Sequence, residues 1–194
     1  MSTFLAIATG YVLGSLPFAF LLARRRGVDL RQTGSGNVGA ANVLRTSGAP
    51  LALLAMALDG LKGALAVVVA ERITAGPVAP VAAGLASVVG HVYPVWLRFR
   101  GGKGVATAAG AFSVLAPAAL AAAVTVFVMV VAFTRVISVG SISAAVTLAA
   151  MTVVTRSSWI VIAGAIVAAV LIVHRHRGNL ARLAAGTERR IGGA

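Results

Sequence analysis

Residues 34–45, GSGNVGAANVLR, combine small residues with one fixed cation, a combination that suits phosphate binding. Glycine and serine leave main-chain N–H groups open to an anion, and a planar guanidinium holds two phosphate oxygens at once. A tight connection between two helices would explain the glycines equally well. The residues expected to contact phosphate are Gly34, Ser35, Gly36, Asn37, Gly39, Asn42 and Arg45.

The same segment contains the literal dinucleotide pattern G-x-G-x-x-G, at Gly34, Gly36 and Gly39, with Asp59 twenty residues further on. That fingerprint acts only after a strand, within a βαβ unit. Here an apolar helical run and a group of arginines precede it, so we exclude dinucleotide binding.

The segment GGKG at residues 101–104 is a second candidate anion site, because it opens a predicted helix. Glycine N–H groups at a helix N-terminus attract anions, and Lys103 adds a mobile charge. The P-loop pattern is absent, since Leu97 replaces its first glycine and Gly104 its Ser or Thr. We therefore predict phosphate contacts, without a nucleotide, from Gly101, Gly102, Lys103 and Gly104.

A third candidate lies in the C-terminal tail, where His176, Asn179 and Arg182 recur at three-residue spacing. On a helix these side chains share one face. An amphipathic helix lying on anionic lipid is the alternative. His174 and Arg175 are expected to end the preceding span.

Asp59 and Lys62 lie one helical turn apart inside an apolar run, so they can neutralise each other. They form either a structural pair or a support for the arginines of the first segment. The sequence leaves two roles open for His91, packing in the protein interior or a part in the active site.

Three serines, Ser138, Ser141 and Ser143, open another predicted helix. Hydroxyls there either cap the helix or bind phosphate, and capping is favoured, with Ser141 retained as a candidate phosphate ligand.

The composition limits the chemistry. The chain has no cysteine, its three histidines are dispersed, and its four carboxylates form no ligand cluster. No set of nucleophile, base and orienting group suits a covalent acyl-enzyme. We predict no metal and no cofactor, so positioning and electrostatics would carry any catalysis.

These residues must be positioned by membrane helices, since 59% of the 194 residues are apolar and the mean hydropathy is +0.98. We predict an all-α integral membrane protein that forms a single polytopic domain over residues 1–194. Seven transmembrane helices are expected, at about residues 3–23, 49–70, 78–97, 104–116, 118–134, 139–155 and 158–174.

The number seven depends on a break at Pro117, because residues 104–134 as one helix would measure about 46 Å, against a hydrocarbon core of about 30 Å. With seven helices the N-terminus lies outside and the C-terminus in the cytoplasm. Fourteen of the seventeen basic residues then face the cytoplasm, Arg135 among them and the others within residues 24–48, 98–104 and 175–194, while Arg72 and Arg156 face outside and Lys62 lies within a helix. The net charge of +13 thus reflects topology, and no nucleic acid partner is predicted.

Read together, the cytoplasmic motifs resemble the bacterial acyl-phosphate:glycerol-3-phosphate acyltransferases of the PlsY type over almost the full length. The resemblance rests on GSLPFAFLLARRRGVDLRQTGSGNVGAANVLR at residues 14–45, DGLKG at 59–63, GHVYPVWLRFRGGKGVAT at 90–107 and HRGNLARLAAGTE at 176–188.

The resemblance implies transfer of a fatty acyl group from acyl phosphate to the 1-hydroxyl of sn-glycerol 3-phosphate, which gives lysophosphatidic acid and phosphate. It implies a seven-helix fold in the bacterial inner membrane, with a cytoplasmic active site and no protein nucleophile. By motif, it makes Ser35, Arg45, Lys103, His176 and Asn179 catalytic and Glu188 structural. His176 is preferred to His174 because it keeps the spacing to Asn179.

Acyl phosphate, glycerol 3-phosphate and the lipid bilayer are the expected partners, with no obligatory protein partner and a monomeric state. The His-x-x-x-x-Asp pair of acyltransferases that use acyl-CoA is absent, since Trp96 stands five residues after His91. A transporter for phosphate or an organic phosphate is the alternative. It would favour a midplane site and an inverted repeat, and neither is visible in the sequence.

Overall fold

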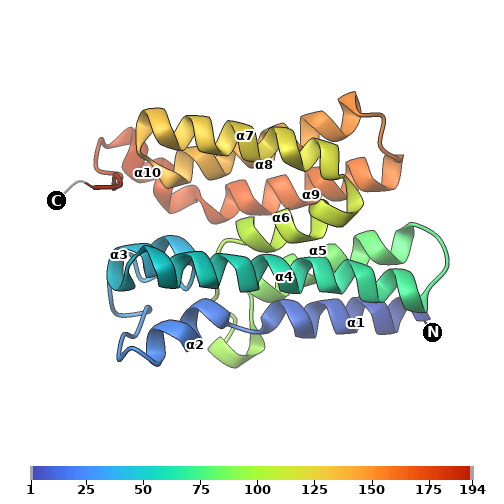
Figure 1. Cartoon of the computed structure of the whole chain (residues 1–194), viewed down its shortest axis with the longest axis horizontal. Helices are drawn as coiled ribbons and strands as arrows, with labels where there is room; N and C mark the ends of the chain where they lie inside the picture. Colours follow the sequence, from blue (N-terminus) through green and yellow to red (C-terminus); the bar gives the residue numbers. More distant parts are fainter. Residues whose placement is uncertain (1, 193–194) are drawn as a thin grey trace. The chain divides into compact units, whose positions relative to one another are not determined.

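The computed structural model describes residues 2–192, within which every regular element is a helix (Figure 1). The chain divides into two compact units, Met1–Leu115 and Ala116–Ala194, which are described separately below. The predicted single polytopic domain stays a prediction.

Unit 1 is built on the long helix α4, against which α1, α2, α3, α5 and α6 all pack. Its helices are α1 Ser2–Ser15, α2 Phe18–Arg24, α3 Ala40–Ser47, α4 Ala49–Ile73, α5 Val78–Val92, the short 3₁₀ helix η1 Val95–Leu97 and α6 Val105–Leu115.

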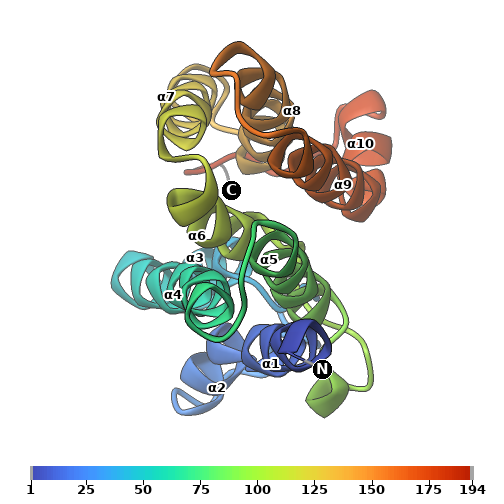
Figure 2. The same cartoon turned by 90° about the vertical axis from the view of Figure 1, so that its right-hand side faces the viewer.

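Helices α1 and α5 approach each other closely, as Figures 1 and 2 both show. A Cβ atom placed on Gly14 would lie 2.0 Å from the carbonyl oxygen of Ser87, and one on Gly90 would lie 2.4 Å from that of Tyr11. Both distances are shorter than van der Waals contact. Glycine is therefore required here, as in the small-residue packing typical of membrane helices.

The contact between α4 and α6 follows the same principle. A Cβ atom on Gly63 would lie 2.1 Å from the carbonyl oxygen of Thr107, and one on Gly110 would lie 1.8 Å from that of Gly60. This close packing fixes the start of α6, and therefore the end of the 101–104 segment that precedes it.

Unit 2 contains α7 Pro117–Thr134, α8 Ile137–Val154, α9 Trp159–Arg175 and α10 Arg177–Ala184. Helix α8 packs between α7 and α9, and α10 bends away from α9 by 54°. Large apolar side chains remain exposed on α7, among them Phe133 at 88% and Val128 at 57%. Such surfaces suit lipid rather than water.

Five helical segments in the described chain are long and apolar enough to cross a membrane, or six if α9 and α10 form one bent span. The all-helical membrane fold is therefore as predicted, whereas seven spans stay a prediction. The seventh span is untested because it would be helix α6, whose 11 residues extend only about 16 Å. The predicted break between residues 104–116 and 118–134 is present, at Ala116.

Two elements differ in detail from what the sequence predicted. The expected first span 3–23 is present as the candidate span Ser2–Arg24, but its helix is interrupted at Leu16 and Pro17, between α1 and α2, because proline lacks an N–H and disfavours helix in the residue before it. The polar connection 24–48 contains a helix, α3, which carries Arg45.

Candidate active site

Asn42 organises the segment between α2 and α3. Its side chain is 1% exposed, and its Oδ1 accepts a hydrogen bond from the Ser35 N–H at 2.9 Å. Its Nδ2 donates to the carbonyl oxygens of Leu30 at 3.1 Å and Thr33 at 2.9 Å. Both amide hydrogens are used within the loop, so Asn42 holds the loop, and its contact with phosphate stays a prediction.

Two glycines of this segment are required by its backbone conformation. Gly34 and Gly36 have φ values of +65° and +72°, which favour glycine. The N–H groups of Ser35 and Gly36 donate to the Asn42 side chain and the Thr33 carbonyl oxygen, and phosphate binding by this segment stays a prediction. What remains exposed is the Ser35 side chain, and Arg45 lies on the helix that follows.

A carboxylate holds the start of the same segment. Asp29 accepts hydrogen bonds from the Arg31 backbone N–H and from Nε of its guanidinium, both at 3.0 Å. These hydrogen bonds lower the pKa of Asp29 to about 2. At neutral pH the Asp29 carboxylate is therefore ionised, and its charge is paired with Arg31 inside the loop.

The 101–104 segment packs directly on the end of α5. The N–H of Gly101 donates to the carbonyl oxygen of Val92 at 3.0 Å, and that of Gly102 donates to the carbonyl oxygen of His91 at 3.1 Å. These two N–H groups therefore have backbone partners, and the contact of Gly101 and Gly102 with phosphate stays a prediction. Lys103 follows, half-buried, and Gly104 turns the chain into α6 with a φ of +85°.

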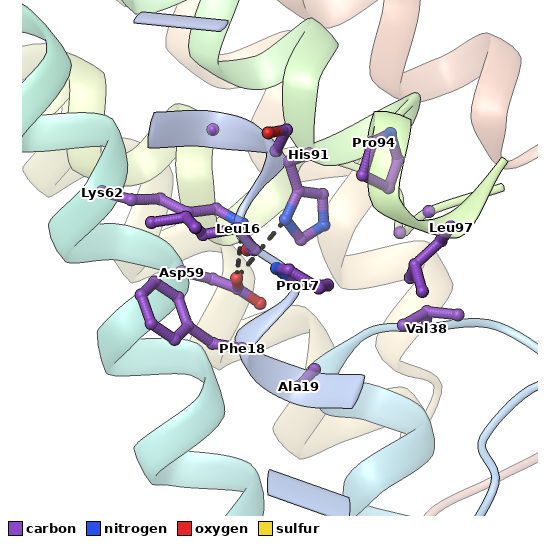
Figure 3. Close-up of a pocket in the computed structure, with 14 residues that line it drawn as sticks. Leu16, Pro17, Phe18, Ala19, Val38, Asp59, Lys62, His91, Pro94 and Leu97 are labelled. Carbon is purple, nitrogen blue, oxygen red and sulfur yellow. Dashed lines mark hydrogen bonds and ion pairs between the residues drawn. The ribbon is translucent and has the colours of Figure 1, made fainter. Parts of the chain in front are cut away.

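Asp59, Lys62 and His91 form a buried cluster beside this segment (Figure 3). Lys62 Nζ lies 2.8 Å from Asp59 Oδ1, so the predicted pair forms. His91 Nδ1 lies 3.5 Å from the same oxygen. Leu16, Gly101 and Gly102 join the cluster in lining a small pocket.

In unit 2, the structure separates the two candidate histidines. His174 is exposed and lies 2.9 Å from the guanidinium of Arg177. His176 is 2% exposed, and its Nδ1 lies 2.8 Å from the carbonyl oxygen of Ile172. A carbonyl only accepts, so Nδ1 carries the proton. His176 is thus buried and bound to the backbone of α9, whereas His174 is exposed and contacts a side chain.

Glu188 holds the tail to the rest of unit 2. It accepts hydrogen bonds from Ser138 Oγ at 2.8 Å, from Arg182 Nε at 2.7 Å and from Asn179 Nδ2. Burial raises the pKa of this carboxyl, but the three hydrogen bonds outweigh it and hold the pKa below the ordinary value of 4.5.

The expected capping by serines was wrong. Helix α8 has no side-chain cap because its N-cap residue is Val136, and Ser138, already inside the helix, donates to Glu188. Ser141 Oγ donates to the carbonyl oxygen of Ile137 at 2.9 Å, within the helix. A contact between Ser141 and phosphate stays a prediction.

The described residues contain no group of three or more His, Asp or Glu side chains placed to hold a metal ion, and the absence of a metal stays a prediction. Sequence reasoning missed the support given by Asn42 and the contact of His91 with the 101–104 segment. Neither contact could be predicted from the spacing of residues, because each depends on how the chain folds back on itself.

Comparisons with known proteins agree along nearly the whole chain. The family model described as glycerol-3-phosphate acyltransferase matches residues 4–186. A relative of that name from Myxococcus xanthus (strain DK1622) is 47% identical over 187 residues, with 95% of this chain and 97% of the relative covered. One from Geobacter sulfurreducens (strain ATCC 51573 / DSM 12127 / PCA) is 42% identical over 184 residues, with 95% of each covered.

Two crystal structures of PlsY (YgiH), an integral membrane glycerol 3-phosphate acyltransferase, share the fold. The glycerol 3-phosphate form matches with a TM-score of 0.95 and 38% identity, covering 99% of this chain and 96% of that one. The lysophosphatidic acid form matches with a TM-score of 0.92 and 37% identity, covering 98% and 95%.

The apolar helices and the shared fold define an integral membrane protein. The chain belongs to the glycerol-3-phosphate acyltransferase family, and it is a membrane acyltransferase.

Proposed function

We propose that this enzyme transfers a fatty acyl group from acyl phosphate to the 1-hydroxyl of sn-glycerol 3-phosphate. The hydroxyl oxygen bonds to the acyl carbonyl carbon, the bond from that carbon to the phosphate oxygen breaks, and the hydroxyl proton passes to the departing phosphate. The products are lysophosphatidic acid and inorganic phosphate, in the first acylation of phospholipid synthesis. The observation that carries the proposal is the full-length match to a family whose solved member is described in a glycerol 3-phosphate form.

The donor proposed here is already activated, because phosphate is its leaving group. The protein then needs only to hold the hydroxyl beside the carbonyl carbon and to stabilise the developing charge. Ser35 and Arg45 of unit 1, and His176 and Asn179 of unit 2, are proposed to act in this step. Lys103, following the glycines at 101 and 102, is proposed to bind the phosphate of glycerol 3-phosphate.

The proposed setting is the bacterial inner membrane, crossed seven times, with the N-terminus outside and the substrates bound from the cytoplasm by a monomer. The distribution of basic residues supports this orientation, because segments rich in Arg and Lys stay on the cytoplasmic side.

The test is phosphate release by the purified protein in detergent, given acyl phosphate with and without glycerol 3-phosphate, and acyl-CoA as the alternative donor. We expect release that depends on glycerol 3-phosphate and ignores acyl-CoA. Arg45→Ala and Lys103→Ala should lose at least about a hundredfold in kcat/KM, because each removes a cation from a phosphate.

Arg72→Ala is the matched control, since Arg72 is an exposed cation at the far end of α4. It should keep wild-type turnover. Full activity of Arg45→Ala or Lys103→Ala would remove the assigned roles. No phosphate release by the wild type would reject the proposed reaction and bring the transporter forward.

A further inference from the structure

The Asp59 cluster takes no part in the proposed reaction, although it places two charges in the interior of unit 1. Asp59 and Lys62 are each 2% exposed, and His91 is 8% exposed. A buried ion pair seldom stabilises a fold more than apolar side chains of the same size would, because both charges lose their hydration. Its neighbours therefore indicate more about its role than its charge does.

One arm of the cluster reaches the break between α1 and α2. Lys62 Nζ donates a hydrogen bond of 2.8 Å to the carbonyl oxygen of Leu16, just before Pro17. Pro17 has no N–H, so the helix ends there with carbonyl groups that need other partners. The Lys62 ammonium is such a partner for the Leu16 carbonyl oxygen, and Asp59 holds this ammonium in place.

The other arm reaches the 101–104 segment through His91. The backbone oxygen of His91 accepts the Gly102 N–H, and the imidazole lies against the same glycine. A Cβ atom on Gly102 would lie 2.1 Å from His91 Nε2, and one on Gly101 would lie 2.1 Å from the His91 oxygen. The two glycines thus rest on the backbone and the ring of a single residue.

The orientation of the ring is therefore coupled to the position of the segment. Asp59 is the charged group beside His91 Nδ1 (Figure 3), and the other ring nitrogen, Nε2, faces Gly102. A ring that turned away from Asp59 would either collide with Gly102 or leave it unsupported. Lys103, the next residue, would move with it.

We propose that Asp59 and His91 are positioning residues, which fix the Gly101–Gly102 backbone and thereby aim Lys103 at the phosphate of glycerol 3-phosphate. The inference rests on the proposed role of Lys103. It predicts a defect in the binding of glycerol 3-phosphate only, because the cluster contacts the segment that carries Lys103.

The experiment compares His91→Ala, which removes the ring, with the double variant Asp59→Asn/Lys62→Met, which removes both charges at similar size and leaves no unpaired ion. Each is tested for monodisperse elution, for KM of both substrates, and for amide hydrogen exchange of the peptide spanning residues 98–104. Both should raise KM for glycerol 3-phosphate by about tenfold to a hundredfold, as expected for a binding group displaced by about 1 Å. KM for acyl phosphate should change little, and exchange at Gly101 and Gly102 should increase while α4 stays protected.

Val81→Ala is the matched control, since Val81 is buried on α5 about three turns before His91. It should lower thermal stability without changing KM or exchange in the 98–104 peptide. Unchanged exchange at residues 98–104 in both cluster variants would overturn the proposal, and so would equal increases across α4, α5 and the segment, which would mean a general loss of packing. If the wild type does not respond to glycerol 3-phosphate, the proposed function fails, while the exchange measurement still tests the positioning.

Discussion

Three polar side chains, those of Asn42, His91 and Glu188, each hold a turn of backbone in place. Asn42 binds three backbone groups of one loop, His91 supports two glycines, and Glu188 accepts from three side chains. Few polar groups are available in this chain, and a buried one left without a partner is costly. The loops carrying the proposed catalytic residues are thus defined by fixed side-chain contacts.

Replacing Glu188 by alanine removes the acceptor of the buried Ser138 hydroxyl and the contacts of Glu188 with Asn179 and Arg182. A buried hydroxyl that loses its partner costs about 1–3 kcal/mol, so the folded yield should fall more than the specific activity of the protein that folds. Fluorescence-detected gel filtration, together with activity per folded molecule, measures the two effects. Glu71→Ala, at an exposed carboxylate, is the control. A well-folded but inactive Glu188→Ala protein would make Glu188 catalytic instead.

The same carboxylate predicts a dependence on pH. Its pKa in the folded protein lies below the ordinary 4.5, so Glu188 binds protons less readily when folded than when unfolded. Its contribution to stability is therefore complete above about pH 4.5 and is lost as the pH falls through the folded pKa. Melting curves of the wild type should decline over this range, and those of Glu188→Ala should decline less.

At the scale of elements, the apolar runs predicted most helix ends to within a few residues. The run 158–174 became α9 Trp159–Arg175, and the break near Pro117 is where the length of a bilayer requires it. Periodicity and length are local properties, so the sequence alone is sufficient for them. Helix α3 was missed because its polar residues and the glycines before it are equally typical of a loop.

Helix α4 offers a matched pair of glycines, Gly60 and Gly63. A Cβ on Gly63 would collide with the Thr107 carbonyl, whereas one on Gly60 would lie 3.6 Å from the Ala106 oxygen, an ordinary contact. Gly63→Ala should therefore lower stability by about 1–3 kcal/mol through overpacking. Gly60→Ala should be neutral or slightly stabilising, since alanine is the better helix former. Thermal melting of both variants in detergent tests this difference. Equal losses of stability in the two variants would mean that α6 does not pack against α4 as described.

At the scale of the whole molecule, the order in which the chain crosses the membrane is the main prediction still to be tested. The chain contains no cysteine, so single cysteines can be placed without background. The exposed positions Ala75, Ser158 and Ala185 report on three connections. Labelling with a membrane-impermeant maleimide in intact cells should reach Ala75→Cys and Ser158→Cys, but not Ala185→Cys until the cells are opened.

The outcome depends on α6. If its 11 residues do not cross the bilayer, every later segment changes side, so that Ser158→Cys is protected and Ala185→Cys is labelled. That pattern would reject seven spans and the cytoplasmic C-terminus together.

The candidate site was predictable as residue types on three motifs, but not as geometry. Phosphate binding by Gly34 and Gly101 stays a prediction, and the structure adds a backbone role for each: Gly34 adopts a left-handed conformation and Gly101 approaches the His91 carbonyl closely. Both depend on how the chain folds back on itself, which the spacing of the motifs does not encode. The choice of His176 over His174 rested on spacing alone, and the burial of His176 now adds a physical reason for it.

The close approach of α1 and α5 also bears on how the protein is made. The surface around Gly14 has its partner on α5, which the ribosome completes only after α2, α3 and α4. At about 5–20 residues per second, α1 waits on the order of ten seconds with that surface facing lipid or the insertion machinery. A bulkier residue at Gly14 or Gly90 would therefore act first during biogenesis, by leaving α1 without a partner in the newly inserted chain.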